Sequence, residues 1–248
     1  MVSGEQFVAI DIGSSKIKTV IWEWNEDKKL RILGVGVSES RGIRKGNILD
    51  MEEFKANLDT SLGEAEKMTG EQVTHVCLGL SGVHIDIARK TGIVAIGWVE
   101  VSDEDISRAL DMSQNGVDLM NRSVLKVIPE SFGLDLENGI KNPIGMSGKK
   151  LEVRSHIITM GTNTLSNIKK GVLDVGVEIM DIYPNILAAG ESTLSRRQKE
   201  LGVVVLDIWS SATNIAVYEE GSLIFATVIH IGGEHVTSDL ALGLRISI

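Results

Sequence analysis

The chain has 248 residues, of which 43% are hydrophobic, and it carries a formal net charge of −9. This size suits one large or two moderate globular domains, and the negative charge argues against a nucleic-acid partner, because binding the phosphate backbone needs clustered lysine and arginine. Cys77 is the only cysteine, which excludes a disulfide framework and a thiolate metal site. The first residues lack the pattern of a secretory signal, and no apolar run reaches the roughly 20 residues that span a bilayer, so we expect a cytoplasmic protein.

The first part of the chain predicts strands, then a helix, then another strand. Alternating apolar residues predict a strand pair over 7–24 and a third strand over 30–37. Asp50 is a suitable N-cap for a helix that ends near Gly70. A short buried strand over 73–82 completes an α/β pattern.

The middle of the chain predicts further α/β units. The strand over 92–101 precedes a helix capped by Ser102, whose acidic first turn suits the helix dipole. The later elements are expected to be strands over 123–135 and 151–160 around a loop over 137–150, a helix over 163–176, a strand over 177–184 and a helix over 185–202.

The opening pattern then recurs. Residues 203–218, VVVLDIWSSATNIAVY, match residues 7–22, FVAIDIGSSKIKTVIW, as an apolar strand, Asp-Ile, one variable residue, Ser-Ser and a second strand. Two such hairpins indicate two related lobes. Only the start of a helix follows the second copy, so we expect the sequence to be a fragment or the product of an early stop.

A hairpin tip with an aspartate, a glycine and small hydroxyl residues carries groups that suit a nucleotide. A carboxylate can hold Mg²⁺ through its waters, a glycine admits phosphate oxygens to backbone N–H groups, and hydroxyls donate to the same oxygens. Lys16 and Lys18 leave the first tip on one face of their strand, so one of them could reach a phosphate. The alternatives are a simple tight turn, or a duplicated hairpin of which one copy has lost its chemistry; the repeat favours a two-sided phosphate clamp.

These segments resemble the actin, Hsp70 and sugar-kinase ATPase superfamily, and within it the bacterial FtsA cell-division family. The resemblance rests on AIDIGSSKIKTVI, SRGIRKGNILD, VSDEDISRAL, GIKNPIGMSGKKLEVRSHIIT, LAAGESTLSRRQKELGVVVLDI and VIHIGGEHVTSDLALGLR, which occur in the family's order. The most specific segment is NPIGMSGKKLEVRSHI, because it belongs to the SHS2 subdomain that FtsA proteins insert in place of a usual actin subdomain.

The resemblance implies an α/β fold with an actin-like, ribonuclease H-like lobe, an inserted α/β subdomain and the first part of a second actin-like lobe. We therefore expect residues 1–84 and 160–201 to form the first lobe (subdomain 1A) and residues 85–159 the inserted subdomain (1C). Residues 202–248 are expected to begin the second lobe (2A).

The resemblance also implies roles for single residues. Asp11 and Asp207 would hold Mg²⁺ through water, and Asn185 matches the place of a water-positioning glutamine, so that Asn185 and Asp207 are the candidate catalytic residues. The residues expected to bind ATP are Asp11, Gly13, Ser14, Ser15, Lys18, Ser210, Ser211, Thr213, Gly232 and Gly233.

The second hairpin departs from the family's Asp-Ile-Gly-Gly-Gly-Thr-Thr-Asp. Trp209, Ser210 and Ser211 replace the three glycines, and Asn214 replaces the last aspartate. An indole and the loss of free positive φ both hinder backbone approach to phosphate. Two interpretations stay open: Trp209 faces the packed side of its strand, or the site is weakened.

By resemblance, the chain is an ATP-binding, filament-forming division protein that links FtsZ to the cytoplasmic face of the membrane and helps assemble the septum ring. The FtsZ-binding subdomain and the C-terminal membrane helix of the family lie beyond the residues matched here. The nucleotide is expected to be mainly structural or regulatory, with weak or absent hydrolysis. The alternatives are an actin-like ATPase of another membrane machine such as pilus assembly, and a small-molecule kinase, for which we find no candidate base outside the hairpins.

Three other patterns are set aside. GMSGKK lacks the glycine spacing and the final Ser or Thr of a P-loop, and GLSGV lacks the full nucleophile elbow. The five histidines show no metal-ligand spacing.

Overall fold

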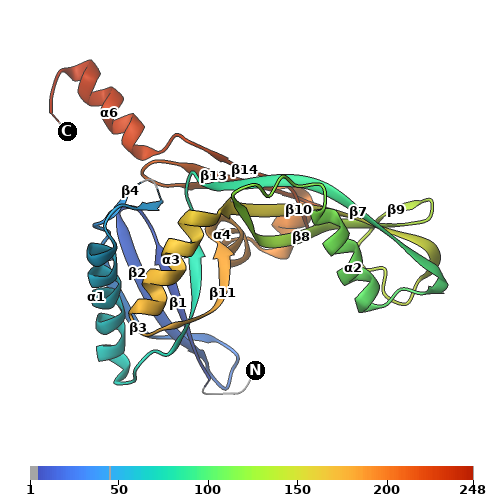
Figure 1. The fold of residues 1–248 in the computed structure, drawn as a ribbon, viewed down its shortest axis with the longest axis horizontal. Helices are drawn as coiled ribbons and strands as arrows, with labels where there is room; N and C mark the ends of the chain where they lie inside the picture. The colour runs from blue at the N-terminus through green and yellow to red at the C-terminus, as the bar shows by residue number, and fades with distance from the viewer. Residues whose placement is uncertain (1–4, 45, 248) are drawn as a thin grey trace.

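The computed structural model describes residues 5–44 and 46–247 (Figure 1). Residues 1–4, 45 and 248, which belong to the expected lobes, lie outside the described residues. Among the described residues, no helix combines the length and the apolar character needed to cross a membrane.

The first sheet has five strands in the order β11-β6-β1-β2-β3. Its strands are β1 (Gln6–Ile12), β2 (Lys16–Trp24), β3 (Leu30–Glu39), β6 (His75–Leu80) and β11 (Glu178–Pro184). The first three form an antiparallel meander, whereas β6 and β11 run parallel to β1. The sheet is therefore mixed, and all of its strands come from residues expected to form the first lobe.

Two helices lie side by side against this sheet (Figure 1). Helix α1 (Met51–Thr69) begins at Asp50, whose side chain accepts from the N–H groups of Glu52 and Glu53, and it ends at Gly70 in the left-handed conformation. Helix α3 (Thr162–Asp174) packs against α1 so closely that a Cβ atom on Gly171 would meet the Phe54 ring at 2.4 Å. The buried faces of both helices join the core of the sheet.

A second sheet extends away from the first, on the right of Figure 1. It is antiparallel in the order β7-β10-β8-β9 and carries α2 on one face. Its elements are β7 (Ile85–Glu100), α2 (Asp103–Gln114), β8 (Arg122–Leu134), β9 (Glu137–Ile140) and β10 (Ser147–Gly161). The expected loop over 137–150 therefore contains a short strand and the start of a long one, and the strand expected from residue 92 begins seven residues earlier, at Ile85.

The third sheet contains the second hairpin. It consists of β12 (Val203–Ile208), β13 (Thr213–Glu219) and β14 (Ser222–Ile229), all antiparallel, and α6 (Gly233–Leu244) follows it. Tyr218 and Leu223 lie in the same core as the first sheet. The other face of this sheet exposes apolar side chains, including Leu206 and Ile208.

Short elements connect these sheets. Strands β4 (Ile43–Arg44) and β5 (Asn47–Ile48) pair beside the first hairpin, and α4 (Asn185–Thr193) contacts both the first and the third sheet. The helix expected over 185–202 is divided, because Ser195 caps a new helix, α5 (Arg196–Leu201), with a capping box to Gln198.

Candidate functional site

The tips of the two Asp hairpins meet in the fold. In the first hairpin Asp11 pairs with Lys18 across the strands, and Gly13 N–H donates to the Lys16 carbonyl at 3.1 Å. In the second hairpin Asp207 pairs with Asn214, and Trp209 N–H donates to the Ala212 carbonyl at 2.9 Å. The two turns thus close in the same way, as the sequence repeat predicts.

Asp11 is a partly buried carboxylate with two polar partners. Asn185 Nδ2 donates to Asp11 Oδ1 at 2.8 Å, and Lys18 Nζ lies 3.5 Å from Oδ2. Burial raises the pKa of Asp11 above its ordinary value, whereas Asn185 and Lys18 oppose that rise. The negative charge of Asp207 also raises this pKa, and it is the smallest of these influences.

Asn185 is placed by the end of β11 and the start of α4. It is the first residue of α4, directly after Pro184. Gly79 on the neighbouring strand β6 leaves room for it, because a Cβ atom there would meet Asn185 Oδ1 at 2.4 Å. The amide therefore reaches Asp11 from a position that the first sheet holds.

Trp209 contacts the first hairpin. A Cβ atom on Gly13 would meet Trp209 Cζ3 at 2.8 Å, and Lys18 Nζ lies 5.7 Å from the indole centroid. The indole Nε1–H donates to Asp207 Oδ2 at 2.5 Å, and Asn214 Nδ2 donates to the same oxygen at 3.1 Å. The indole thus lies on the side of β12 that carries Asp207 and that packs, through Val203 and Val205, against the main core, and from there it contacts the first hairpin.

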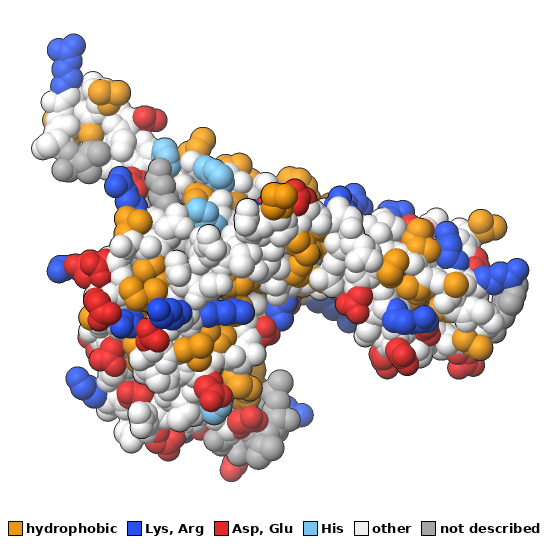
Figure 2. Space-filling view, in the orientation of Figure 1, with side chains coloured by type: hydrophobic (Ala, Val, Ile, Leu, Met, Phe, Trp, Pro, Cys, Tyr) orange, Lys and Arg blue, Asp and Glu red, His pale blue; other side chains and the backbone are white. Residues whose placement is uncertain are grey.

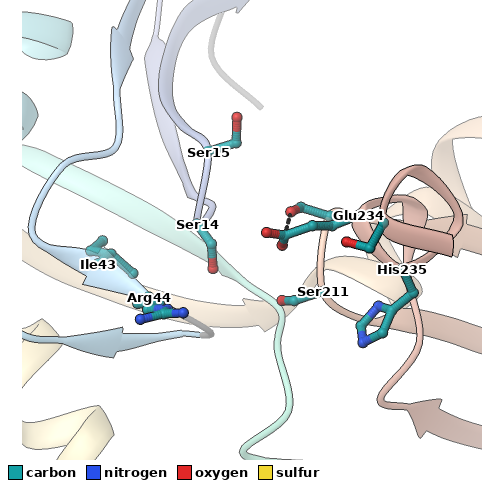
Figure 3. Close-up of a pocket in the computed structure, with 9 residues that line it drawn as sticks. Ser14, Ser15, Ile43, Arg44, Ser211, Glu234 and His235 are labelled. Carbon is teal, nitrogen blue, oxygen red and sulfur yellow. Dashed lines mark hydrogen bonds between the residues drawn. The ribbon is translucent and has the colours of Figure 1, made fainter. Parts of the chain in front are cut away.

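A pocket of about 490 Å³ lies beside the two tips (Figure 3). Ser14 and Ser15 lie on one side of it, and Ser211, Glu234 and His235 on the other. Its complete lining is Ser14, Ser15, Ile43, Arg44, Ser210, Ser211, Glu234, His235 and Ser238. Hydroxyl groups from both hairpins therefore border a space in which an anion could accept their hydrogen bonds.

The remaining predicted residues support the second tip from behind. A Cβ atom on Gly232 would meet the Trp209 carbonyl oxygen at 2.2 Å, and Gly233 N–H donates to that oxygen at 2.8 Å. The Thr213 hydroxyl donates to the Ile231 carbonyl at 2.7 Å. These groups hold the start of α6 against the tip and do not line the pocket.

Sequence reasoning missed four polar residues of the pocket. Glu234 accepts from the Ser210 hydroxyl at 3.0 Å, and His235 Nδ1 accepts from Gly232 N–H at 3.1 Å. Both follow the glycine pair directly, which was the available signal.

Arg44 and Ser238 line the pocket from β4 and α6, and their place depends on how these elements pack. Figure 2 shows histidine side chains gathered where α6 leaves the body of the molecule.

The donor set suits a metal-nucleotide in part. Within residues 5–44 and 46–247, no group of three or more His, Cys, Asp or Glu side chains could hold a metal directly. The carboxylates of Asp11 and Asp207 and the serines of the pocket instead have the chemistry that suits a hydrated divalent cation and its phosphates, although neither carboxylate lines the pocket itself. These groups therefore fit Mg²⁺ and phosphate, except that the Trp209 indole already occupies one oxygen of Asp207.

Two family models match this chain. The model described as the SHS2 domain inserted in FtsA matches residues 82–159, and the model described as cell division protein FtsA matches residues 204–248.

Similar proteins with this description cover nearly the whole chain. The cell division protein FtsA of Pseudomonas aeruginosa is 36% identical over 98% of this chain and 58% of its own length. That of Bacillus subtilis is 36% identical over 100% of this chain and 56% of its own length, and that of Escherichia coli K12 is 35% identical over 94% and 56%. The chain thus spans less than two thirds of the length of these relatives.

Solved structures share the fold at low sequence identity. The PilM-PilN type IV pilus biogenesis complex contains a chain that matches with a TM-score of 0.72 at 12% identity, covering 97% of this chain and 66% of the other. The ethanolamine utilization protein EutJ of Carboxydothermus hydrogenoformans matches with a TM-score of 0.55 at 13% identity, covering 99% and 59%. The fold is α/β and actin-like, with an inserted SHS2 domain.

Proposed function

Because this chain belongs, over its 248 residues, to the FtsA family of cell-division proteins, we propose that it binds ATP with Mg²⁺ between its two Asp hairpins. The observation that carries the proposal is the contact between the two tips, which brings Trp209 of the second tip against Gly13 of the first and places serines from both hairpins around one pocket. If each hairpin tip were only a tight turn, the two tips would not need to meet.

The residues divide the work by their chemistry. Asp11 and Asp207 would hold Mg²⁺ through water, and the cation would neutralise phosphate charge. Ser14, Ser15 and Ser211 would donate hydroxyl hydrogen bonds to phosphate oxygens. The further phosphate-binding residues that we propose are Gly13, Lys18, Ser210, Thr213, Gly232 and Gly233, with the last three acting by holding the second tip in place.

We propose that the nucleotide serves assembly more than chemistry. Asn185, the candidate for positioning a water molecule, already donates to Asp11, and one oxygen of Asp207 already accepts from Trp209 and Asn214. Both candidate catalytic residues are thus engaged with neighbouring side chains, which favours slow or absent hydrolysis.

Family membership supports a set of partners. We propose that the protein self-associates into filaments, links FtsZ to the inner face of the cell membrane, and helps other division proteins assemble the septum ring. A role in pilus assembly is the weaker candidate, because the likeness to the PilM-PilN chain at 12% identity is one of fold alone.

The proposed lobes are residues 1–84 with 160–201, the inserted subdomain 85–159, and the start of a second lobe, 202–248. The separate sheets support this division, since β7 begins at Ile85 and β12 begins at Val203.

Calorimetric titration of the protein with ATP and Mg²⁺ tests the proposal directly. We expect saturable heat that disappears when a chelator removes the cation. Absence of heat at high ATP concentration would contradict the proposed function.

Two alanine variants test the division of work between the hairpins. We expect Asp11→Ala to weaken Mg²⁺-dependent binding by about tenfold or more, since a lost charged partner corresponds to roughly 1.5–3 kcal/mol. Ser210→Ala is the matched control at the other tip, and it should have a smaller effect because that hydroxyl donates to Glu234. Equal losses in the two variants would show that the hairpins do not differ in this way.

A further inference from the structure

Trp209 stands between the two hairpins at the place where the proposed ligand would join them. We propose that in the free protein the Trp209 indole holds the two hairpin tips in contact, and that it has to leave Asp207 before a metal-nucleotide binds. The second half of this proposal rests on the proposed function, whereas the first half concerns the free protein alone.

The first hairpin receives the indole because Gly13 has no side chain. A Cβ atom at Gly13 would lie 2.8 Å from Trp209 Cζ3 and 2.9 Å from the Lys16 carbonyl oxygen, so any larger residue would displace one of them. Glycine at this position is expected for approach of a phosphate, but here it admits an aromatic ring. The ring thus uses space that the backbone of the first tip leaves open.

Within the second hairpin, the indole N–H group of Trp209 is hydrogen-bonded to Asp207. Nε1–H donates to Asp207 Oδ2 at 2.5 Å, and Asn214 donates to the same oxygen. A hydrogen bond to a carboxylate is stronger than one between neutral groups. A hydrated cation at Asp207 would therefore compete with the indole for this oxygen.

Lys18 completes the contact from the first hairpin. Its Nζ lies 5.7 Å from the indole centroid, within the range of a cation–π interaction, and 3.5 Å from Asp11 Oδ2. Lys18, Asp11 and Asp207, which are all proposed to face the ligand, thus have partners in the free protein. The Trp209 side chain supplies two of these contacts, one to Lys18 and one to Asp207.

The backbone hydrogen bonds of the second tip do not involve the indole. Trp209 N–H donates to the Ala212 carbonyl, and the Trp209 carbonyl accepts from Gly233 N–H at 2.8 Å. The Ser210 carbonyl accepts from Glu234 N–H at 2.9 Å. All of these bonds are made by the backbone, so we expect the second tip to keep its shape when the side chain rotates or is removed.

Hydrogen–deuterium exchange on the free protein tests, without any ligand, whether Trp209 holds the two tips in contact. We expect Trp209→Gly to increase exchange at least severalfold in residues 13–18 of the first hairpin. Trp209→Phe, which keeps a ring but loses the N–H donor, should lie between this variant and the parent. Trp22→Phe is the matched control, because Trp22 stacks on Phe7 away from the tips. Unchanged exchange in residues 13–18 of Trp209→Gly overturns the proposal.

Binding of ATP with Mg²⁺ provides the second measurement. Trp209→Gly should bind about tenfold more tightly than the parent, because no contact has to be broken first; tenfold corresponds to about 1.4 kcal/mol. Binding that is equal or weaker overturns the competition between indole and ligand. If neither protein binds, the proposed function fails, and the exchange experiment alone decides whether Trp209 fastens the tips.

Discussion

At the scale of single residues, the site contains a carboxylate whose burial opposes its charge. Desolvation raises the pKa of Asp11, and the amide of Asn185 and the ammonium of Lys18 only partly offset it. In the free protein the charged form is therefore less favourable than in water. The ionised Asp11 thus lowers the folding stability of the free protein, as residues at ligand-binding sites commonly do.

We expect Asp11→Asn to raise the melting temperature of the free protein while it weakens Mg²⁺-dependent nucleotide binding. A raised folded pKa means that the ionised aspartate disfavours folding above that pKa, and that the penalty disappears as the pH falls through it. The gain from Asp11→Asn should thus be largest near neutral pH and shrink in acid. Thermal melts across this range measure it.

The control for this variant is Asp59→Asn, which makes the same change of charge at an exposed position of α1. A lower melting temperature for Asp11→Asn than for the parent at neutral pH would show that the Lys18 and Asn185 contacts outweigh burial.

At the scale of elements, close packing of helices on sheets depends on particular glycines. A Cβ atom at Gly36 of β3 would lie 1.8 Å from the carbonyl oxygen of Ser61 in α1. The Ser61 hydroxyl, which is buried, lies 3.1 Å from the Gly36 carbonyl and 2.9 Å from the Thr19 hydroxyl. A strand glycine also lets a helix approach closely in the second sheet, since a Cβ atom at Gly92 of β7 would lie 1.9 Å from the Ala109 carbonyl of α2.

Gly36→Ala is expected to lower the free energy of unfolding by about 1–3 kcal/mol or more, because helix and strand would have to separate. Gly63→Ala is the matched control within α1, since a Cβ atom at Gly63 has nothing within 4 Å. It should stabilise the protein by up to about 1 kcal/mol through helix propensity. Urea denaturation of both variants distinguishes them, and similar behaviour would contradict the packing argument.

Local signals predicted most of these elements. Asp50, Ser102 and Gly70 mark helix ends by hydrogen bonds or dihedral angles that involve only near neighbours, so the sequence carries the information. The strand β9 and the early start of β7 escaped prediction because their pairing partners lie on β8 and β10. The break before Ser195 was visible as a capping box, Ser195 with Gln198, but a longer helical pattern concealed it.

At the scale of the whole molecule, the inserted subdomain contacts the third sheet as well as the first. The buried His156 lies on β10, and its Nε2 is 3.0 Å from the Leu223 carbonyl of β14. Lys141 Nζ donates to the Glu220 carbonyl at 2.6 Å and to the Ser222 hydroxyl at 2.9 Å. The turn between β13 and β14 is thus held by the subdomain inserted between the two halves of the first lobe.

His156 makes this contact sensitive to pH. Burial lowers the pKa of His156 below its ordinary value of 6.5, with the charge of Arg89 acting in the same direction and that of Glu130 opposing it. As the pH falls below 6.5, the unfolded chain binds a proton that the folded chain does not, so the free energy of unfolding falls by up to about 1.4 kcal/mol per pH unit until the folded pKa is reached.

His156→Gln should remove this part of the acid sensitivity, since glutamine can still donate to the Leu223 carbonyl but does not titrate. Urea denaturation at several pH values measures the slope. His75→Gln makes the same substitution at an exposed position of β6 and is the control for the substitution itself. An unchanged slope in His156→Gln would mean that other groups govern the acid response.

Residue patterns were enough to identify the two Asp hairpins, the capped helices and the likeness to a family, because each depends on residues within about ten positions of one another or on a recurring pattern. The packing of distant segments was needed to establish that the tips touch, that Asn185 reaches Asp11 and that Arg44 and His235 line the pocket. It also decided where Trp209 points. A side chain between two distant segments is placed by the space that each leaves open, here Gly13 on one side and the Asp207 carboxylate on the other.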